Sequence, residues 1–333
     1  MVIPLAVTMG EPAGIGGEIA LKAWLSRVHG IPPFYMIDDP DRLAALARDL
    51  GWQVPIRAID APDEASAVFD EALPVAPIGI TLRTRPACPD PAAAKAVLGA
   101  IDAGVRDVMS GRAAALVTNP IHKDTLYRAG FRYPGHTEYL GALAGVTEAP
   151  VMMLACPGLR VVPVTIHVAL RQAIQDLSTA AIVHVGRVTK AALRQDFGVA
   201  APTLAVAGLN PHAGEAGGLG REEIEIIEPA IAELRAAGID VRGPLAADTM
   251  FHAEARGNYD AALCMYHDQA LIPIKTIDFH GGVNITLGLP FVRTSPDHGT
   301  AFAIAGRGIA RAESLIAALR LAAEMATKRA SAV

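Results

Sequence analysis

Three histidines, His167, His212 and His267, occupy similar places in the sequence, each at the end of a short apolar run or just behind one. These runs are Val161–His167, Thr203–Leu209 and Ala261–Tyr266. Nearly continuous apolar runs of this length are typical of buried parallel strands, and ligands of α/β proteins bind beyond the carboxyl ends of such strands. A neutral imidazole binds divalent metals well, and three protein ligands leave coordination positions for a substrate. The pattern therefore predicts a catalytic metal site, although each histidine alone also fits a hydrogen-bonded loop residue.

A second group of residues has the chemistry of an anion site. The glycine-rich stretch 281–295 contains Asn284 and Arg293, and Lys275 comes shortly before it. Basic side chains beside exposed backbone amides hold phosphate or carboxylate groups, while a solvated lysine and a structural arginine are the simpler alternative. His136 and Thr137 fit a helix start, with Thr137 as the capping residue, and helix starts also favour anions.

The opening loop, Gly10–Glu18, invites comparison with nucleotide-binding loops. It lacks the Lys-Ser/Thr pair of a P-loop and the G-x-G-x-x-G spacing of a dinucleotide fingerprint. A tight turn that feeds a helix over Glu18–Val28 explains the loop equally well, so it carries little functional weight.

The elements that position these residues alternate between strands and helices. Besides the three runs above, strands are expected over Val2–Met9 and Ala113–Thr118. Helical periodicity covers Leu177–Gln195, Glu222–Ala237 and Arg311–Lys328. Such alternation predicts an α/β fold with a mainly parallel sheet.

Composition limits the possible function classes. The chain has 333 residues, of which 52% are hydrophobic and 19% charged, and its net charge of -5 argues against nucleic acid as the main partner. No apolar run is long enough to cross a membrane, and the first residues do not resemble a signal peptide. Three widely spaced cysteines do not form a disulfide framework, and Cys264 is expected in the core. A cytoplasmic location is therefore expected.

Several segments together closely resemble the 4-hydroxythreonine-4-phosphate dehydrogenase family of pyridoxal phosphate biosynthesis. They are Thr8–Gly16, Thr118–Lys123, Gly135–Glu138, Leu209–Glu215, Gly243–Thr249, Met265–Gln269, Gly282–Pro290 and Asp297–Ala301. The resemblance runs in order along nearly the whole chain, whereas residues 27–112 contain no matching motif.

The resemblance implies an α/β fold like that of isocitrate and isopropylmalate dehydrogenases, with two lobes, a cleft between them and a homodimeric assembly. The lobes are expected at approximately residues 1–135 plus 300–333, and residues 136–299. The family pattern also implies that His167, His212 and His267 bind the metal, and that the two subunits share this site. Zinc, cobalt, magnesium and manganese all remain open as the metal.

The other site residues follow from the same resemblance. Substrate is expected on five residues, namely His136, Thr137, Lys275, Asn284 and Arg293. NAD(P) is expected on four residues, namely Asn284, Leu287, Gly288 and Arg293. Lys275, Asp248 and Asp268 are three candidates for the proton-transfer residue, and the sequence does not rank them.

The implied reaction is the metal-assisted, NAD(P)-dependent oxidation and decarboxylation of 4-(phosphooxy)-L-threonine to 3-amino-2-oxopropyl phosphate. The nearest alternative is a relative that acts on 4-phospho-threonate, a phosphorylated erythronate or a cyclic dihydrodiol. The basic residues favour a phosphorylated, carboxylated substrate over a dihydrodiol. A zinc hydrolase or metal-dependent aldolase with the same histidines would need no NAD.

Overall fold

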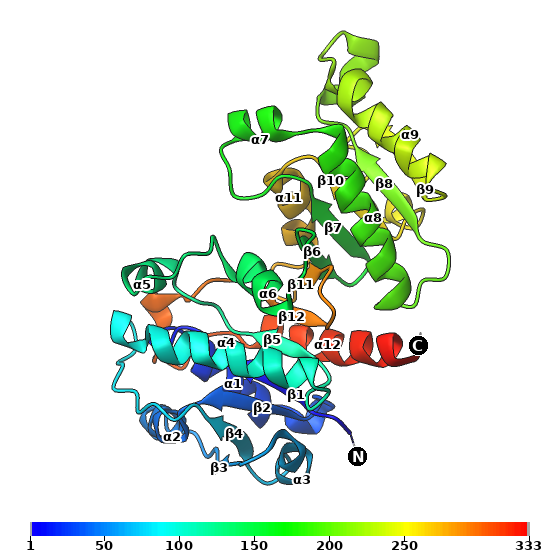
Figure 1. Ribbon diagram of the computed structural model, residues 1–333. Helices are drawn as coiled ribbons and strands as arrows, with labels where there is room; N and C mark the ends of the chain where they lie inside the picture. The colour runs from blue at the N-terminus through cyan, green and yellow to red at the C-terminus, as the bar shows by residue number, and fades with distance from the viewer. Residues whose placement is uncertain (1, 332–333) are drawn as a thin grey trace. The chain divides into compact units, whose positions relative to one another are not determined.

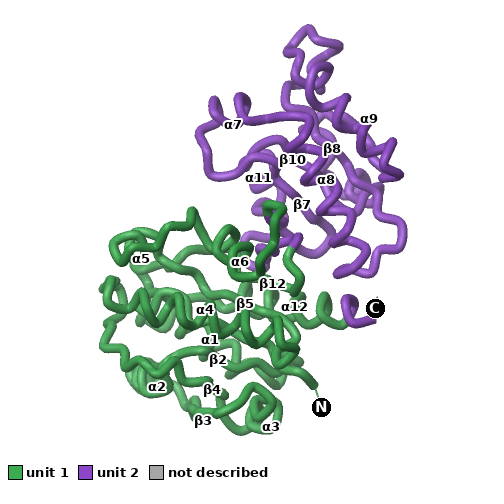
Figure 2. The backbone as a smooth tube through the Cα atoms, viewed as in Figure 1, with its two compact units in different colours: residues 1–149, 289–327 green, residues 150–288, 328–333 purple. Residues whose placement is uncertain are grey.

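The computed structural model describes residues 2–331, which form two compact units. Unit 1 comprises Met1–Ala149 and Leu289–Thr327, and unit 2 comprises Pro150–Gly288 and Lys328–Val333 (Figure 2). Unit 1 is therefore built from two segments that are distant in the sequence. Each unit is described separately below.

Unit 1 contains a six-stranded sheet in the order β3-β4-β2-β1-β5-β12, and all its neighbouring strands are parallel. The strands are β1 (Leu5–Thr8), β2 (Phe34–Asp38), β3 (Ile56–Ala58), β4 (Leu73–Pro77), β5 (Leu116–Thr118) and β12 (Arg293–Pro296). β1, β2, β5 and β12 are buried along their whole length, as expected for parallel strands covered on both faces.

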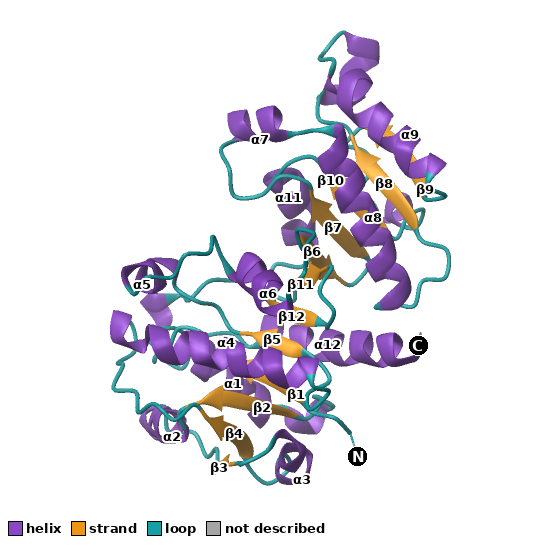
Figure 3. Cartoon of the chain, in the orientation of Figure 1, coloured by secondary structure: helices purple, strands orange, loops and turns teal. Residues whose placement is uncertain are grey.

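Within the described residues, seven helices lie wholly or mostly in unit 1. They are α1 (Gly16–Leu25), α2 (Pro40–Asp49), α3 (Ala65–Val68), α4 (Ala94–Met109), α5 (Lys123–Arg128), α6 (His136–Ala144) and most of α12 (Glu313–Ser331). Four 3-10 turns join them: Arg27–His29, Pro62–Glu64, Pro91–Ala93 and Phe302–Ile304. α4 crosses β1, β2 and β5 (Figure 3), and its Ile101 and Val105 share a buried core cluster with Tyr35 and Leu116.

Unit 2 contains a mixed sheet in the order β11-β6-β7-β10-β8-β9. The strands are β6 (Val151–Cys156), β7 (Leu159–Pro163), β8 (Thr203–Ala207), β9 (Asp240–Leu245), β10 (Ala261–Cys264) and β11 (Val283–Leu287). β6 is antiparallel to both of its neighbours, whereas β7, β10, β8 and β9 run parallel. The parallel strands β7, β10 and β8 are adjacent, so their carboxyl ends lie along one edge of the sheet.

The helices of unit 2 are α7 (Leu170–Asp176), α8 (Thr179–Gln195), α9 (Glu228–Ala236), α10 (Ala253–Arg256) and α11 (His267–Ile277) (Figure 1). A 3-10 segment spans Pro211–Gly217, and a π-helical turn spans Glu223–Ile227. Ala270 and Ile274 of α11 pack with Val161, Ala262 and Cys264 on one face of the sheet. Cys264 is therefore a core residue as expected, and all three cysteines of the chain are free.

The expected α/β class with mainly parallel sheets is confirmed, and each predicted strand and helix corresponds to an observed one. The observed strands are shorter than predicted, and next to β1, β5 and β10 the apolar run continues into buried loop residues. Met9 is one example, since it is fully buried one residue beyond the end of β1. The helix expected over Glu222–Ala237 starts with a π-helical turn before α9 begins at Glu228.

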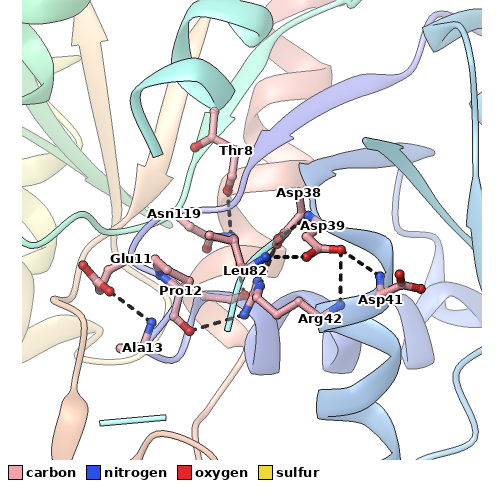
Figure 4. A network of polar contacts seen from close by, with 11 residues as sticks. Thr8, Glu11, Pro12, Ala13, Asp38, Asp39, Asp41, Arg42, Leu82 and Asn119 are labelled. Atoms are coloured by element: carbon pink, nitrogen blue, oxygen red, sulfur yellow. Dashed lines mark hydrogen bonds and ion pairs between the residues drawn. The ribbon is translucent and has the colours of Figure 1, made fainter. Parts of the chain in front are cut away.

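In unit 1, backbone contacts join the loops that follow β1 and β5. The Glu11 amide donates to the Pro120 carbonyl at 2.8 Å. Figure 4 shows a second contact, in which the side-chain Nδ2 of Asn119 donates to the Thr8 carbonyl at 3.1 Å. Gly10 lies between these loops with φ +68°, and an added Cβ would be 2.6 Å from the Pro120 oxygen. The opening loop is therefore held by tight backbone packing, which only a residue without a side chain permits.

Gly10→Ala should lower the free energy of unfolding by about 2–4 kcal/mol, because the methyl group clashes with backbone and the left-handed conformation adds strain. Gly30→Ala is the matched control, since Gly30 has φ +74° with nothing within 4 Å of an added Cβ. It should cost only about 1 kcal/mol, from backbone strain alone. Urea unfolding of both variants measures the difference, and equal losses would contradict the clash.

Candidate active site

The three histidines follow the three adjacent parallel strands of unit 2. His167 comes after β7, His212 after β8 and His267 after β10. The expectation that His167 ends its strand is wrong, because β7 stops at Pro163 and His167 lies four residues later in a bend, with φ +51°. The chain leaves the sheet here as Thr165 Oγ1 donates to the Met265 carbonyl at 2.8 Å, in place of a continued strand ladder.

His167 and His267 share one pocket. Their ring centroids are 5.6 Å apart, and the pocket has a volume of about 190 Å³. It is lined by Thr165, His167, Val168, Leu170, Ala173, Tyr266, His267 and Asp268. Two imidazoles beside a small, partly apolar pocket can supply two nitrogen ligands to one ion.

A carboxylate orients the second of these rings. His267 Nδ1 lies 2.8 Å from Asp268 Oδ1, so Nδ1 is the nitrogen that carries the proton in the neutral ring. The Nε2 atom of His267 is then the one with a lone pair available for a metal. Asp268, one of the three proton-transfer candidates, thus has a defined contact that suits it to orient a ligand.

His212 lies in a backbone segment of unusual conformation. Residues 212–216 all have positive φ, between +46° and +78°, and only Gly214 among them is a glycine. The left-handed region costs a non-glycine residue roughly 1–2 kcal/mol, so the surrounding structure must hold this turn. Glu223 does so in part, because its Oε1 accepts hydrogen bonds from the amides of Leu209 and Asn210, each at 2.7 Å.

His212 does not line the pocket of His167 and His267. Within residues 2–331, no three side chains of the histidine, cysteine, aspartate and glutamate types are placed so that they could bind one metal. Unit 2 therefore contains two of the three expected ligands in one pocket, whereas His212 is exposed and lies outside this pocket. Two imidazoles on one pocket are donors that fit a divalent metal.

The basic residues of unit 1 form a second candidate site. Arg293, at the start of β12, is only 4% exposed, and its Nε and Nη2 atoms donate to Thr118 Oγ1 at 3.1 and 2.5 Å. Burial lowers the pKa of the Arg293 guanidinium to about 10, so it remains a cation at neutral pH. A buried guanidinium that donates to a hydroxyl group is a fixed positive charge, and such a group can bind an anion.

His136 is the first residue of α6. Its Nε2 atom is buried and has no hydrogen-bond partner within the residues that the structure describes. Burial, and then the positive charges of Arg293 and Lys123, hold the pKa of His136 well below its usual value, so the ring is neutral. The expectation that Thr137 caps this helix is wrong. Gly135 occupies the N-cap in an extended conformation and no side chain caps the helix, so Thr137 lies inside the first turn.

The remaining predicted residues lie in unit 2. Lys275 is on α11, where its Nζ atom lies 5.3 Å from the centre of the Phe279 ring. Asn284 and Leu287 are on β11, and Gly288 follows this strand with φ +84°. Asp248 is exposed in the turn after β9. The predicted substrate residues are thus divided between the units, with His136, Thr137 and Arg293 in unit 1 and Lys275 and Asn284 in unit 2.

Comparison with known proteins decides the family. The model of the family described as pyridoxal phosphate biosynthetic protein PdxA matches residues 31–322. The chain belongs to the PdxA family. The family assignment expected from the motifs is thereby confirmed, and the match includes most of the segment 27–112, in which no motif was found.

Relatives of this PdxA-family chain are similar over almost their whole length. The 4-hydroxythreonine-4-phosphate dehydrogenase of Bradyrhizobium diazoefficiens is 54% identical, with 98% of each chain covered. That of Methylorubrum populi is 55% identical, covering 99% of this chain and 96% of the relative. The crystal structure of the enzyme of that name from Klebsiella pneumoniae is 39% identical with a TM-score of 0.88, covering 98% of this chain and 100% of that one. The expected enzyme class, a dehydrogenase, is confirmed by these matches.

None of the helices within residues 2–331 of this PdxA-family chain has both the length and the apolar character that a membrane-spanning helix needs.

Lys123 is a residue near the candidate anion site that the sequence did not identify as a site residue. It lies at the start of α5 and close to His136. Lys123 ends the family motif Thr118–Lys123, but nothing in the sequence places it beside residue 136.

Proposed function

We propose that this chain oxidises the C3 hydroxyl of 4-(phosphooxy)-L-threonine with NAD(P)⁺ in the biosynthesis of vitamin B6. The hydride on C3 passes to the nicotinamide and the hydroxyl proton passes to a base. The resulting β-keto acid loses carbon dioxide and gives 3-amino-2-oxopropyl phosphate. The near-complete match to 4-hydroxythreonine-4-phosphate dehydrogenases carries this proposal.

The anion-binding residues of unit 1 support a substrate of this kind. Arg293 is buried and charged, and the neutral ring of His136 and the uncapped start of α6 lie near it. His136, Thr137 and Arg293 would bind the anionic groups of the substrate, together with Lys275 and Asn284. Lys275, Asp248 and Asp268 remain candidates for the base. For Asp268, we propose that its main role is to orient the ring of His267.

We propose that His167 and His267 of one subunit and His212 of the other hold a divalent metal, either zinc, cobalt, magnesium or manganese. Such an ion, when bound, would acidify the substrate hydroxyl and polarise the ketone that precedes decarboxylation. Large exposed apolar side chains around the pocket and the turn support a second copy as the partner. They are Val168, Leu170, Ile174, Leu219 and Ile224.

For the cofactor, we propose a site on Asn284, Leu287, Gly288 and Arg293. The positive φ of Gly288 and the absence of its side chain leave backbone accessible at the end of β11. Both NAD and NADP are compatible with these residues. Relatives that act on 4-phospho-threonate or a phosphorylated erythronate would use the same basic groups, so such a substrate is the alternative to test.

A substrate panel tests the proposed function. Reduction of NAD⁺ and NADP⁺ is followed at 340 nm with 4-(phosphooxy)-L-threonine, 4-phospho-D-erythronate, 4-phospho-threonate and a cis-dihydrodiol, before and after chelation and metal addition. The highest kcat/KM is expected for 4-(phosphooxy)-L-threonine, with activity lost on chelation and restored by a divalent metal. A higher kcat/KM for one of the other acids would replace the proposed substrate, and the absence of NAD(P) reduction with all of them would favour a hydrolase or aldolase.

A further inference from the structure

An ammonium group lies against the first turn of α6. If Gly135 carried a Cβ atom, Lys123 Nζ and Cε would each be 3.5 Å from it, so the lysine side chain reaches the N-cap of this helix. Lys123 is itself exposed at the start of α5, so its ammonium reaches the helix start from the solvent side.

The first residue of α6 also lies near the positive charge of a buried arginine. Burial lowers the pKa of His136 most, and Arg293 and Lys123 both lie close enough for their positive charges to lower it further. The buried Nε2 atom of His136 has no partner among residues 2–331, and no side chain caps the first amides of α6. Two cations, an imidazole nitrogen and free helix amides together point to an anionic ligand.

We propose that Lys123 binds the phosphoryl group of the substrate at the N-terminus of α6, together with the buried Arg293. This inference rests on the proposed function, since it assigns the phosphorylated end of that substrate to this place. Lys123 would be a binding residue in addition to the five that the family resemblance supplied.

Charge matching explains why two cations are needed. A phosphate monoester carries between -1.5 and -2 charges at neutral pH, whereas a carboxylate carries one. Two cations match the charge of a phosphoryl dianion better than one, and Lys123 adds a cation at the start of α6. Glu138 Oε2 also lies near Gly135, 3.4 Å from the position of an added Cβ, and partly offsets Lys123 when no ligand is bound. The second cation thus favours phosphorylated acids over dihydrodiols.

Lys123→Met tests the inference in the full-length protein. The KM for 4-(phosphooxy)-L-threonine should rise by roughly 10- to 100-fold with kcat changed by less than about 3-fold, because the phosphoryl group takes no part in hydride transfer or decarboxylation. Calorimetry with inorganic phosphate at pH 8 should show an affinity loss of about 10-fold or more. Lys95→Met is the matched control, since Lys95 is an exposed lysine of the same unit on α4 and should leave both values unchanged.

Unchanged phosphate affinity in Lys123→Met, or the same loss in Lys95→Met, would overturn the inference. A fall in kcat with KM unchanged would also overturn it, because Lys123 would then act on the reaction rather than on binding. A wild-type protein that does not oxidise 4-(phosphooxy)-L-threonine would refute the proposed function. In that case a loss of phosphate affinity confined to Lys123→Met would still support the anion site.

Discussion

Replacing His212 with alanine should lower kcat/KM for 4-(phosphooxy)-L-threonine by about 10³-fold or more and abolish metal retention, while the protein stays folded. Loss of one of three ligands removes an interaction worth several kcal/mol in the transition state, and about 4 kcal/mol corresponds to a factor of 10³. His212 is exposed, so its truncation leaves no cavity in the core. Ala213 and Ala216 already have the same left-handed backbone, so alanine at 212 should shift stability by less than about 1 kcal/mol.

His252→Ala provides the control for this experiment. His252 is an exposed histidine of the same unit, at the N-cap of α10, and lies outside every predicted site. Metal content is measured by mass spectrometry after dialysis, fold by circular dichroism, and activity after chelation and metal addition. The His252 variant should match the wild type in all three measurements. Full activity of His212→Ala after chelation would remove His212 from the proposed metal site.

Several parallel strands, among them β1, β5, β8 and β10, were predictable from the sequence because they are largely buried and therefore consist of nearly continuous apolar runs. The runs at 203–209 and 261–266 contain β8 and β10, and each is followed by a histidine beyond its carboxyl end. Since β7, β10 and β8 are adjacent in the sheet, the order of these strands brings the three histidine-bearing ends to one edge. The apolar pattern of the sequence predicts such strands, but it gives no information about their order in the sheet.

The local geometry of the histidines could not be predicted, because it depends on contacts between distant residues. Alanine and glutamate have no preference for the left-handed region, so the turn at 212–216 has no signal in its own sequence. Part of its support comes from Glu223, whose carboxylate binds backbone amides 13 and 14 residues earlier. His167 similarly owes its position to a bend that follows Pro163 and is stabilised by Thr165 and Met265.

The contacts of the candidate anion site were even less predictable from the sequence, because they join residues that are far apart in the chain. Arg293 and Thr118 are 175 residues apart in the sequence, and they meet because β12 pairs with β5 inside unit 1. Lys123 begins α5, after the loop that follows β5, and lies near His136. The family resemblance identified Arg293 as a site residue, whereas the place of Lys123 beside the start of α6 depends on the fold.

Mixing two inactive variants should restore activity if the subunits share the metal site. Refolding His212→Ala together with His267→Ala in equal amounts should give about a quarter of the wild-type activity, because random pairing makes half of the dimers mixed. Each mixed dimer has one site with intact His167 and His267 from one subunit and intact His212 from the other. Its second site lacks two ligands.

The pair His167→Ala and His267→Ala gives the opposite expectation and therefore serves as the control. These two side chains share one pocket in a single chain, with ring centroids 5.6 Å apart, so every site of a mixed dimer would lack one of them. No recovery should occur beyond the activity of the separate variants. Recovery in this control, with none for the His212 and His267 pair, would mean that His167 and His267 meet across the subunits instead. No recovery in either mixture would place all three ligands in one chain. Two of the histidines share one pocket, and His212 lies outside it. Activity measurements on mixtures of variants can therefore decide whether His212 reaches the site from the other subunit.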